Sequence, residues 1–312
     1  MADPPILLVA LLMGCDGARH ARDGADGLAA ARRESRAAVY EPPLRRDLDG
    51  ASRLFEAILA PCPDLGHARA LAAVLELEVI EIRTGGETIV MVREAPGARR
   101  GRGFFAFRIG RRRPVAIEAP HSFSDRYTGP IAEKLFVESG AAAAAWNTAS
   151  RSAGSHKEEE EDRERERERE REGGQDESAD LAHLPESFFQ EFTRAFARAH
   201  ADGIVLQLHG FDAEVRGADG PCAILSDATR TPESWVATAA GCLGDAFDRR
   251  TALYPRDAGE LGGTSNAQAK LLRALGSKSF LHLELSLDVR ADLAKDASLR
   301  RRLLLCIPEK VP

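Results

Sequence analysis

Aromatic residues and long hydrophobic runs are scarce in this sequence of 312 residues, and the sequence has no excess of basic residues. Phe, Trp and Tyr make up 6% of it, and 43 Lys and Arg residues are outnumbered by 49 Asp and Glu residues, which gives a net charge of −6. A chain with this balance and no basic face interleaved with aromatics is not expected to bind nucleic acid. No apolar run approaches the roughly 18 residues that a transmembrane helix needs. The hydrophobic content of 44% is nevertheless enough to bury a full core.

Cysteine is also rare, with five residues in the chain. Four of them, Cys62, Cys222, Cys242 and Cys306, are far apart in sequence and lack the close paired spacing of a structural zinc knuckle. In an oxidising compartment they can form two disulfide bridges in three alternative pairings. Four small buried hydrophobic residues are the alternative interpretation.

The N-terminus contains a short apolar segment over residues 5–13, the size of a signal-peptide core. It ends in Leu12-Met13-Gly14-Cys15, which resembles the lipobox of bacterial lipoproteins. That resemblance implies export to the bacterial cell envelope, as a lipoprotein or a periplasmic protein, and a lipid anchor on Cys15. An ordinary buried segment is the alternative, since Met13 is bulkier than the usual small residue.

Two segments differ in composition from the rest of the chain. Residues 16–47 are rich in Gly, Ala, Arg and Asp without a steady period, and we expect a flexible tether there. Residues 152–178 include a strict Glu-Arg alternation from Arg163 to Glu172 and have almost nothing apolar to bury. We expect a solvated low-complexity insertion, disordered or a lone helix, within a domain that spans residues 48–312.

The remaining pattern predicts an α/β fold. Helices are expected at 52–59 and 65–75, a hairpin of strands at 76–83 and 88–93 around a Gly-Gly turn, and strands at 104–109 and 115–119. Helices at 131–139, 185–201, 232–249, 266–275 and 289–304 then alternate with strands at 141–146, 204–208 and 280–285. This alternation predicts a three-layer sandwich around a mixed, mostly parallel sheet, with an N-terminal β-rich portion.

Three of the expected strands end on, or contain, a histidine or a glutamate. His121 follows the strand at 115–119, His209 directly follows the strand at 204–208, and His282 and Glu284 share one face of the strand at 280–285. Ligands of open α/β sheets bind beyond the carboxyl ends of the strands. We therefore expect these side chains to converge on a metal ion, with Asp125, four residues after His121, as a further ligand.

Alternative interpretations exist for each of these residues. His121 can be a surface histidine and Asp125 a helix cap, and His209 can be structural. Glu284 is costly to bury unless it pairs with an arginine such as Arg290 or acts as the general base beside metal-activated water. His282 can instead contact substrate or complete the ligand set.

Weaker candidates lie outside these strands. Arg151 can bind a substrate carboxylate through its guanidinium fork. Asp180 and His183 can orient a ligand histidine. The residues from Gly262 to Asn266 can hold an anion at a helix N-terminus, although an ordinary N-cap is the simpler interpretation.

Residues 113–305 resemble the zinc carboxypeptidase-like superfamily, most closely its N-formylglutamate amidohydrolase-like and poly-γ-glutamate hydrolase-like members. Pro120-His121, Gln207-Leu208-His209-Gly210 and His282-Leu283-Glu284 follow the order of the motifs in that superfamily. The resemblance implies a zinc ion held by His121 and His209, Glu284 as the catalytic base, and Arg151 as a clamp for a carboxylate or oxyanion. The superfamily has a glutamate three residues after the first histidine, where this chain has Ser124, and Asp125 is expected to replace it.

These expectations combine into an exported zinc-dependent hydrolase that cleaves an amide or peptide bond. The metal ligands are His121, Asp125 and His209, Glu284 is catalytic, and Arg151 and His282 contact a small-molecule or peptide substrate. Amides of acidic residues or cell-wall peptides are the expected substrates, by analogy with the superfamily. The alternative is a catalytically inactive surface lipoprotein that binds ligands or partners.

Overall fold

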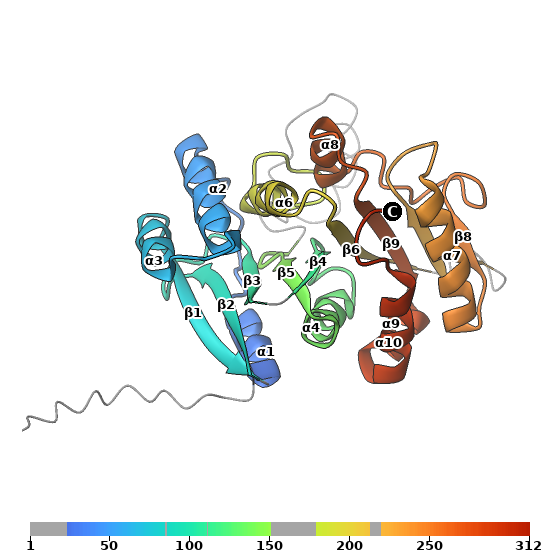
Figure 1. The fold of residues 1–312 in the computed structure, drawn as a ribbon, viewed down its shortest axis with the longest axis horizontal. Coiled ribbons are helices and arrows are strands. Elements are labelled where there is room, and N and C mark those ends of the chain that lie inside the picture. Colours follow the sequence, from blue (N-terminus) through green and yellow to red (C-terminus); the bar gives the residue numbers. More distant parts are fainter. Residues whose placement is uncertain (1–23, 85, 111, 151–178, 213–219) are drawn as a thin grey trace, which may run out of the picture.

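A mixed sheet of nine strands forms the middle layer of the molecule (Figure 1). The structure is a computed structural model, and it describes residues 24–84, 86–110, 112–150, 179–212 and 220–312. Its strands are β1 (Leu77–Thr84), β2 (Glu87–Glu94), β3 (Phe104–Ile109), β4 (Arg113–Ala119), β5 (Ala141–Trp146), β6 (Ile204–Phe211), β7 (Ala223–Ser226), β8 (Thr251–Leu253) and β9 (Phe280–Ser286). They lie in the order β1-β2-β3-β5-β4-β6-β9-β7-β8.

The strands are parallel in the centre of the sheet and antiparallel toward its edges. The pairs β5–β4, β4–β6 and β6–β9 are parallel, as is the outer pair β7–β8. The pairs β1–β2, β2–β3, β3–β5 and β7–β9 are antiparallel. The predicted mixed sheet and the N-terminal hairpin are confirmed, although parallel pairs dominate the centre and not the whole sheet. Short connections, such as the turn between β1 and β2, allow only antiparallel neighbours.

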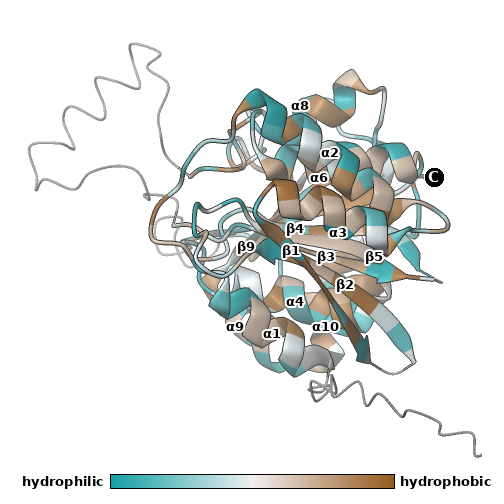
Figure 2. Cartoon of the chain, turned by 90° about the vertical axis from the view of Figure 1, so that its left-hand side faces the viewer, coloured by the Kyte–Doolittle hydropathy of each residue, from teal (hydrophilic) through white to brown (hydrophobic). Residues whose placement is uncertain are grey.

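Helices cover both faces of this sheet (Figure 2). They are α1 (Gly24–Glu34), α2 (Arg45–Leu59), α3 (Leu65–Val74), α4 (Thr128–Ser139), α6 (Phe188–Ala199), α7 (Ser234–Phe247), α8 (Ala267–Ala274), α9 (Leu287–Lys295) and α10 (Ala297–Cys306). Helices α2, α3, α6 and α8 pack into one apolar cluster, and α1, α4, α7, α9 and α10 into another. The predicted three-layer sandwich is thereby confirmed.

Alternate residues of the inner strands belong to opposite clusters, which explains their nearly continuous apolar sequences. In β3, Phe104 packs into the cluster beneath α4, whereas Phe105 and Phe107 pack into the cluster with α2 and α6. Successive side chains of a strand point to opposite faces, so a strand covered on both sides has no polar face.

The tether prediction is wrong for residues 24–47. Residues 24–34 form α1, in which Leu28 is fully buried and Arg32 makes an ion pair of 3.0 Å with Glu133 of α4. Alanine and arginine favour helix, and Leu28 and Ala31 lie three residues apart on one face, which is enough to bind α1 to the domain. The lipobox-like segment, residues 16–23 and the charged insertion at 152–178 lie outside the described residues.

Several smaller features also differ from expectation. Strands β7 and β8 were not expected, because runs of four and three residues carry too little periodicity. The last predicted helix is two helices, divided at Asp296, which accepts hydrogen bonds from the Ser298 and Leu299 N–H groups at the start of α10.

In the part of the chain that the structure describes, no helix is long and apolar enough to cross a membrane.

Of the three disulfide pairings left open, the structure contains a bridge between Cys242 of α7 and Cys306 of α10. Cys222 is a free, buried cysteine and Cys62 a free, exposed one. The four cysteines therefore make one bridge, and the sequence could not select it because 64 residues separate its two ends.

Candidate metal centre

The three strands predicted to present histidines and a glutamate, β4, β6 and β9, are direct neighbours in the sheet. β6 lies between β4 and β9, and the register places Glu118 beside Gln207 and His209 beside Glu284. Because all three strands run in parallel, their carboxyl ends meet at one edge of the sheet. His121, His209, His282 and Glu284 are all buried there, with 3–7% of each residue exposed. The structure thus brings together the residues that the sequence singled out at these strand ends.

His121 is held by an aspartate from a distant loop. Its Nε2 lies 2.8 Å from Oδ1 of Asp180. An ionised carboxylate can only accept, so Nε2 carries the proton and, in the neutral ring, Nδ1 keeps a free lone pair. The structure therefore places Asp180 where it orients His121, while the nearby His183 is exposed.

The electrostatic surroundings of His121 favour a positive charge. Burial by itself lowers the pKa of this imidazole, but the hydrogen bonds and negative charges of Asp125 and Asp180 outweigh burial and raise the pKa to about 9. A pair of carboxylates that stabilises a proton here will also stabilise a metal cation.

Asp125 reaches the same point because the chain makes a helical turn after β4. The N–H groups of Ser124 and Asp125 both donate to the carbonyl of His121, at 3.0 and 2.9 Å. In such a turn residues four apart lie on one side, and Oδ2 of Asp125 is 3.5 Å from Nδ1 of His121. The same oxygen accepts a hydrogen bond of 2.8 Å from the Gly210 N–H. Ser124 is exposed, so Asp125 and not Ser124 faces the site.

His209 completes this group from the end of β6. Its Nδ1 lies 3.2 Å from Nδ1 of His121, and the two rings meet edge to face. Its Nε2 lies 2.7 Å from Oε1 of Gln207, which is an acceptor. The proton of a neutral His209 is therefore on Nε2, and Nδ1 presents a lone pair toward His121 and Asp125.

These three groups fit a tetrahedral zinc ion. Zinc binds imidazole nitrogen at about 2.0–2.1 Å, so neighbouring ligand atoms of a tetrahedral site are about 3.3 Å apart. The distances of 3.2 Å between the two Nδ1 atoms and 3.5 Å between His121 Nδ1 and Asp125 Oδ2 match that spacing. Without a metal, a proton on Nδ1 of His121 lies between the two acceptors, and a metal cation would take its place among the same three atoms. The donor set of two imidazoles and one carboxylate leaves a fourth position for water or substrate.

A second group of potential ligands overlaps the first. His209, His282 and Glu284 also present ligand atoms within 4.8 Å of one another. The rings of His209 and His282 are tilted by 36° with their centroids 4.4 Å apart, and His282 Nε2 lies 3.8 Å from Oε1 of Glu284. The lone pair of His209, however, already faces His121 and Asp125, so the two groups compete for it. The protonation pattern favours one ion, between His121, Asp125 and His209.

His282 lines the site as a neutral imidazole. Burial, together with repulsion from His121 and His183, lowers its pKa to about 3. Among the described residues its Nδ1 has no hydrogen-bond partner. The backbone of Gly263 lies close to the ring, and a Cβ atom there would come within 2.9 Å of it. Gly263 thus packs on His282, and Asn266 caps α8 by accepting from the Ala269 N–H.

Glu284 shares the site with the guanidinium of Arg290. Arg290 donates to the carbonyls of Arg126, at 2.7 Å, and Phe211, at 3.0 Å, and its positive charge acts on both Asp125 and Glu284. A Cβ on Gly210 would come within 2.4 Å of this guanidinium, which explains the glycine after His209. Glu284 is thus a buried acid beside the ligand group, held near a cation that is anchored to the backbone.

The polar residues behind His209 were not among the residues predicted for the site. Gln207, Gln268 and Glu118 are fully buried and bonded to one another through the Gln207 amide nitrogen, at 2.8 Å to Glu118 and 3.2 Å to Gln268. Burial raises the pKa of Glu118 to about 7, although hydrogen bonds from Thr193 and Gln207 oppose the rise. One signal was available, since Glu118 interrupts the apolar sequence of its strand. Arg151, the expected carboxylate clamp, lies outside the described residues.

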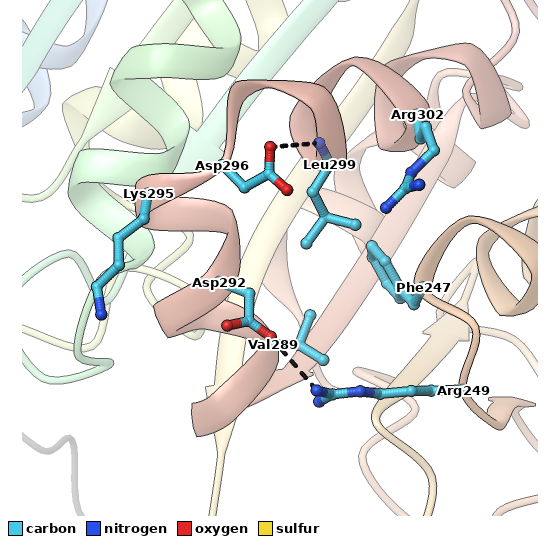
Figure 3. A pocket seen from close by; sticks show the side chains of 8 residues that line it. All are labelled: Phe247, Arg249, Val289, Asp292, Lys295, Asp296, Leu299 and Arg302. Atoms are coloured by element: carbon cyan, nitrogen blue, oxygen red, sulfur yellow. Dashed lines mark hydrogen bonds and ion pairs between the residues drawn. The ribbon is translucent and has the colours of Figure 1, made fainter.

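A hollow of about 250 Å³ lies elsewhere, between the end of α7 and helices α9 and α10 (Figure 3). Arg249 and Asp292 face each other across it at 3.3 Å, and Asp296 accepts from the Leu299 N–H at 3.2 Å. None of the residues predicted for the metal site lines it.

Comparison with known proteins finds likeness in structure only. No family model and no curated protein matches the sequence. N-formylglutamate amidohydrolase from Ralstonia eutropha JMP134 is 12% identical, over 66% of this chain and 96% of that chain, with a TM-score of 0.39. A bacteriophage poly-γ-glutamate hydrolase is 10% identical over 65% and 86%, with a TM-score of 0.34. A metallo-carboxypeptidase from Burkholderia cenocepacia is 15% identical over 79% and 68%, with a TM-score of 0.35.

These three proteins bear the names of the superfamily that the sequence resembles. At such identities and TM-scores the likeness carries no argument about activity. The function has to be inferred from the geometry at the ends of β4, β6 and β9.

Proposed function

We propose that this protein is a zinc-dependent hydrolase of an amide or peptide bond. The observation that carries the proposal is the convergence of three ligand atoms, Nδ1 of His121, Nδ1 of His209 and Oδ2 of Asp125, with His121 Nδ1 at 3.2 Å from His209 Nδ1 and 3.5 Å from the carboxylate oxygen. Acceptors behind both rings, Asp180 and Gln207, hold the protons on the far nitrogens. The carboxylates of Asp125 and Asp180 stabilise positive charge at this point.

A bound zinc ion supplies Lewis acidity, which lowers the pKa of water and polarises a carbonyl. Glu284 is the base in the proposal because it is a buried carboxylate next to His209 in the register of β6 and β9. It takes a proton from the attacking water as the new C–O bond forms, and it delivers that proton to the leaving nitrogen as the C–N bond breaks. Arg290 holds positive charge beside Glu284 and Asp125, and this charge attracts both carboxylates.

The surroundings of the site support a substrate that carries negative charge. Arg126 is exposed and lies over the ring of Tyr127, 4.8 Å from its centroid, and Arg36 is exposed and lies over Phe123 at 5.1 Å. Both belong to, or contact, the segment that carries His121 and Asp125. We therefore place amides of acidic residues, including acidic cell-wall peptides, first among the substrates.

Export to the bacterial cell envelope and a lipid anchor on Cys15 are part of the same proposal. The disulfide between Cys242 and Cys306 supports an oxidising compartment. Metabolic labelling with a fatty-acid analogue tests the anchor, and Cys15→Ser is the control that must lose the label. A protein that stays unlabelled and in the cytoplasm contradicts this part.

The decisive experiment is the Glu284→Gln variant. We expect the purified wild-type protein to contain about one zinc per chain and the variant to retain it, while kcat falls by about 10²–10⁴-fold, the usual contribution of a general base. The assay measures amine release from N-acyl and γ-glutamyl derivatives of glutamate and from cell-wall peptides. A variant as active as wild type would refute the mechanism. A zinc-free wild-type protein without activity would favour the alternative of a binding protein.

A further inference from the structure

We infer that a buried network of side-chain amides fixes which nitrogen of His209 carries the proton, and that Gln207 and Asn266 are positioning residues for the metal site. The inference rests on the proposed function, because the orientation matters only if Nδ1 of His209 binds a cation. It goes beyond that function by assigning a role to residues that contact neither metal nor substrate. The amide network comprises Gln190, Gln207, Asn266 and Gln268, each with at most 4% of its surface exposed.

Two backbone carbonyls determine the orientation of the first amides. Gln268 Nε2 lies 2.9 Å from the carbonyl of Leu181, and Gln190 Nε2 lies 3.2 Å from the carbonyl of Ala267. A carbonyl can only accept, so the nitrogen of each amide must be on that side. The contact between the two amides agrees, because Gln268 Nε2 donates to Oε1 of Gln190 at 2.9 Å.

A backbone N–H determines the orientation of the third amide. Ala269 N–H donates to Oδ1 of Asn266 at 2.9 Å, so that Asn266 has its Nδ2 on the other side. That nitrogen donates to Oε1 of Gln207 at 2.5 Å. From the opposite side, Gln207 Nε2 donates to Oε1 of Gln268 at 3.2 Å.

Independent backbone anchors therefore assign the same orientation to Gln207. Its oxygen faces Asn266 and His209, and its nitrogen faces Gln268 and Glu118. Turning this amide over would place donor against donor and acceptor against acceptor in a buried environment, where unmatched polar groups are costly. His209 must then donate from Nε2, so that its Nδ1 is an acceptor on the side of His121.

The test uses two substitutions of Asn266. One keeps the packing but reverses the orientation of the Gln207 amide, and the other removes packing but leaves that orientation unchanged. Asn266→Asp has nearly the same shape and still caps α8, and the Ala269 N–H and the helix N-terminus favour its ionised form. It replaces the Nδ2 donor by an acceptor, so Gln207 must turn its nitrogen toward residue 266 and His209. Asn266→Ala removes the cap and the packing, but Gln268 and Glu118 still hold Gln207.

For zinc binding measured at pH 8.5 by chelator competition, we expect Asn266→Asp to weaken affinity by about 100-fold and Asn266→Ala by less than about tenfold, within the range seen when partners of metal ligands are removed. Thermal stability should follow the reverse order, since the alanine variant loses the cap. Affinity losses that simply follow the losses in Tm would overturn the inference.

A direct readout does not depend on metal. Long-range ¹H–¹⁵N correlation spectra of the apoprotein report which ring nitrogen of His209 is protonated. We expect Nε2–H in wild type and Asn266→Ala, and Nδ1–H in Asn266→Asp. The matched control is Asn147→Asp, because Asn147 is 1% exposed and donates to the Ala179 carbonyl and not to Gln207; it should destabilise the protein and leave His209 unchanged.

The outcomes separate the two proposals. The same His209 tautomer in wild type and in Asn266→Asp would refute the role of the amide network, even if wild type binds zinc. A wild-type protein with the Nε2–H tautomer that binds no zinc would refute the proposed function and leave the orientation of His209 established.

Discussion

Two regions of this molecule bring acidic and basic side chains together, and the difference between them is instructive. In the hollow between α7, α9 and α10, Arg249 pairs with Asp292 and Asp296 caps a helix, so both of these acids have a donor (Figure 3). At the ends of β4 and β6, two imidazole nitrogens and a carboxylate oxygen face one another, and the only proton among them is the one that His121 carries on Nδ1 when it is charged. A cluster of charges is thus no evidence of a site by itself, whereas three ligand atoms that converge with a single proton among them support one.

The largest effect is expected when one of the proposed metal ligands is removed. His121→Ala and His209→Ala each remove one of the proposed ligands, so zinc affinity should fall by more than the 10–100-fold that loss of a ligand's partner costs, and turnover should be lost. Zinc content after dialysis and kcat/KM measure this. Asp292→Ala in the hollow is the matched control and should change neither quantity. Retention of stoichiometric zinc in both histidine variants would place the ion elsewhere.

A smaller effect should follow when the support of a ligand is removed. Asp180→Ala deletes the acceptor that holds the proton of His121 on Nε2. We expect zinc affinity to fall by about 10–100-fold, whereas Asp180→Asn, which keeps an acceptor oxygen, should lose less. Isothermal titration with zinc distinguishes the two. Equal losses in both variants would show that the negative charge of Asp180, and not its acceptor position, is what matters.

The next prediction concerns the packing of Gly210. A Cβ at this position would come within 2.4 Å of the Arg290 guanidinium, so Gly210→Ala should lower the free energy of unfolding by about 1–3 kcal/mol, as overpacking does. Gly241→Ala provides the contrast, because nothing lies within 4 Å of its Cβ and it sits inside α7. That variant should be more stable by about 0.4–1 kcal/mol. Urea unfolding measures both, and similar changes in the two variants would contradict the contact with Arg290.

The smallest expected effect is a pH dependence outside the site. Burial, with the nearby charge of Arg112, lowers the pKa of His200 to about 4. The unfolded chain takes up this proton near pH 6.5 and the folded chain only near 4, so the free energy of unfolding decreases as the pH falls through that window. His200→Gln should lose less stability than wild type between pH 7 and pH 5. Parallel curves for the two proteins would show that His200 titrates normally in the folded state.

Several strands of the sheet were predicted well from the sequence, because a buried strand has a recognisable local pattern. Strands buried on both faces are short, continuous apolar runs, and β3 and β5 have the expected boundaries. Asp125 was also identifiable, because a turn after β4 places a residue four positions on beside His121. By contrast, α1 was missed because its weak amphipathic pattern is in a segment rich in Gly, Ala and Arg.

What the sequence by itself determined is which chemistry the protein can hold. It has imidazoles and acids at the ends of parallel strands, and such strands have their carboxyl ends at one edge of a sheet. Only the tertiary structure decided how those groups are protonated. The contacts that orient Gln207 and Asp180 join residues 59–89 positions apart, and no local periodicity encodes a hydrogen bond between them. The position of the His209 proton follows from backbone groups, and that of the His121 proton from the Asp180 carboxylate, and these meet only when the chain has folded.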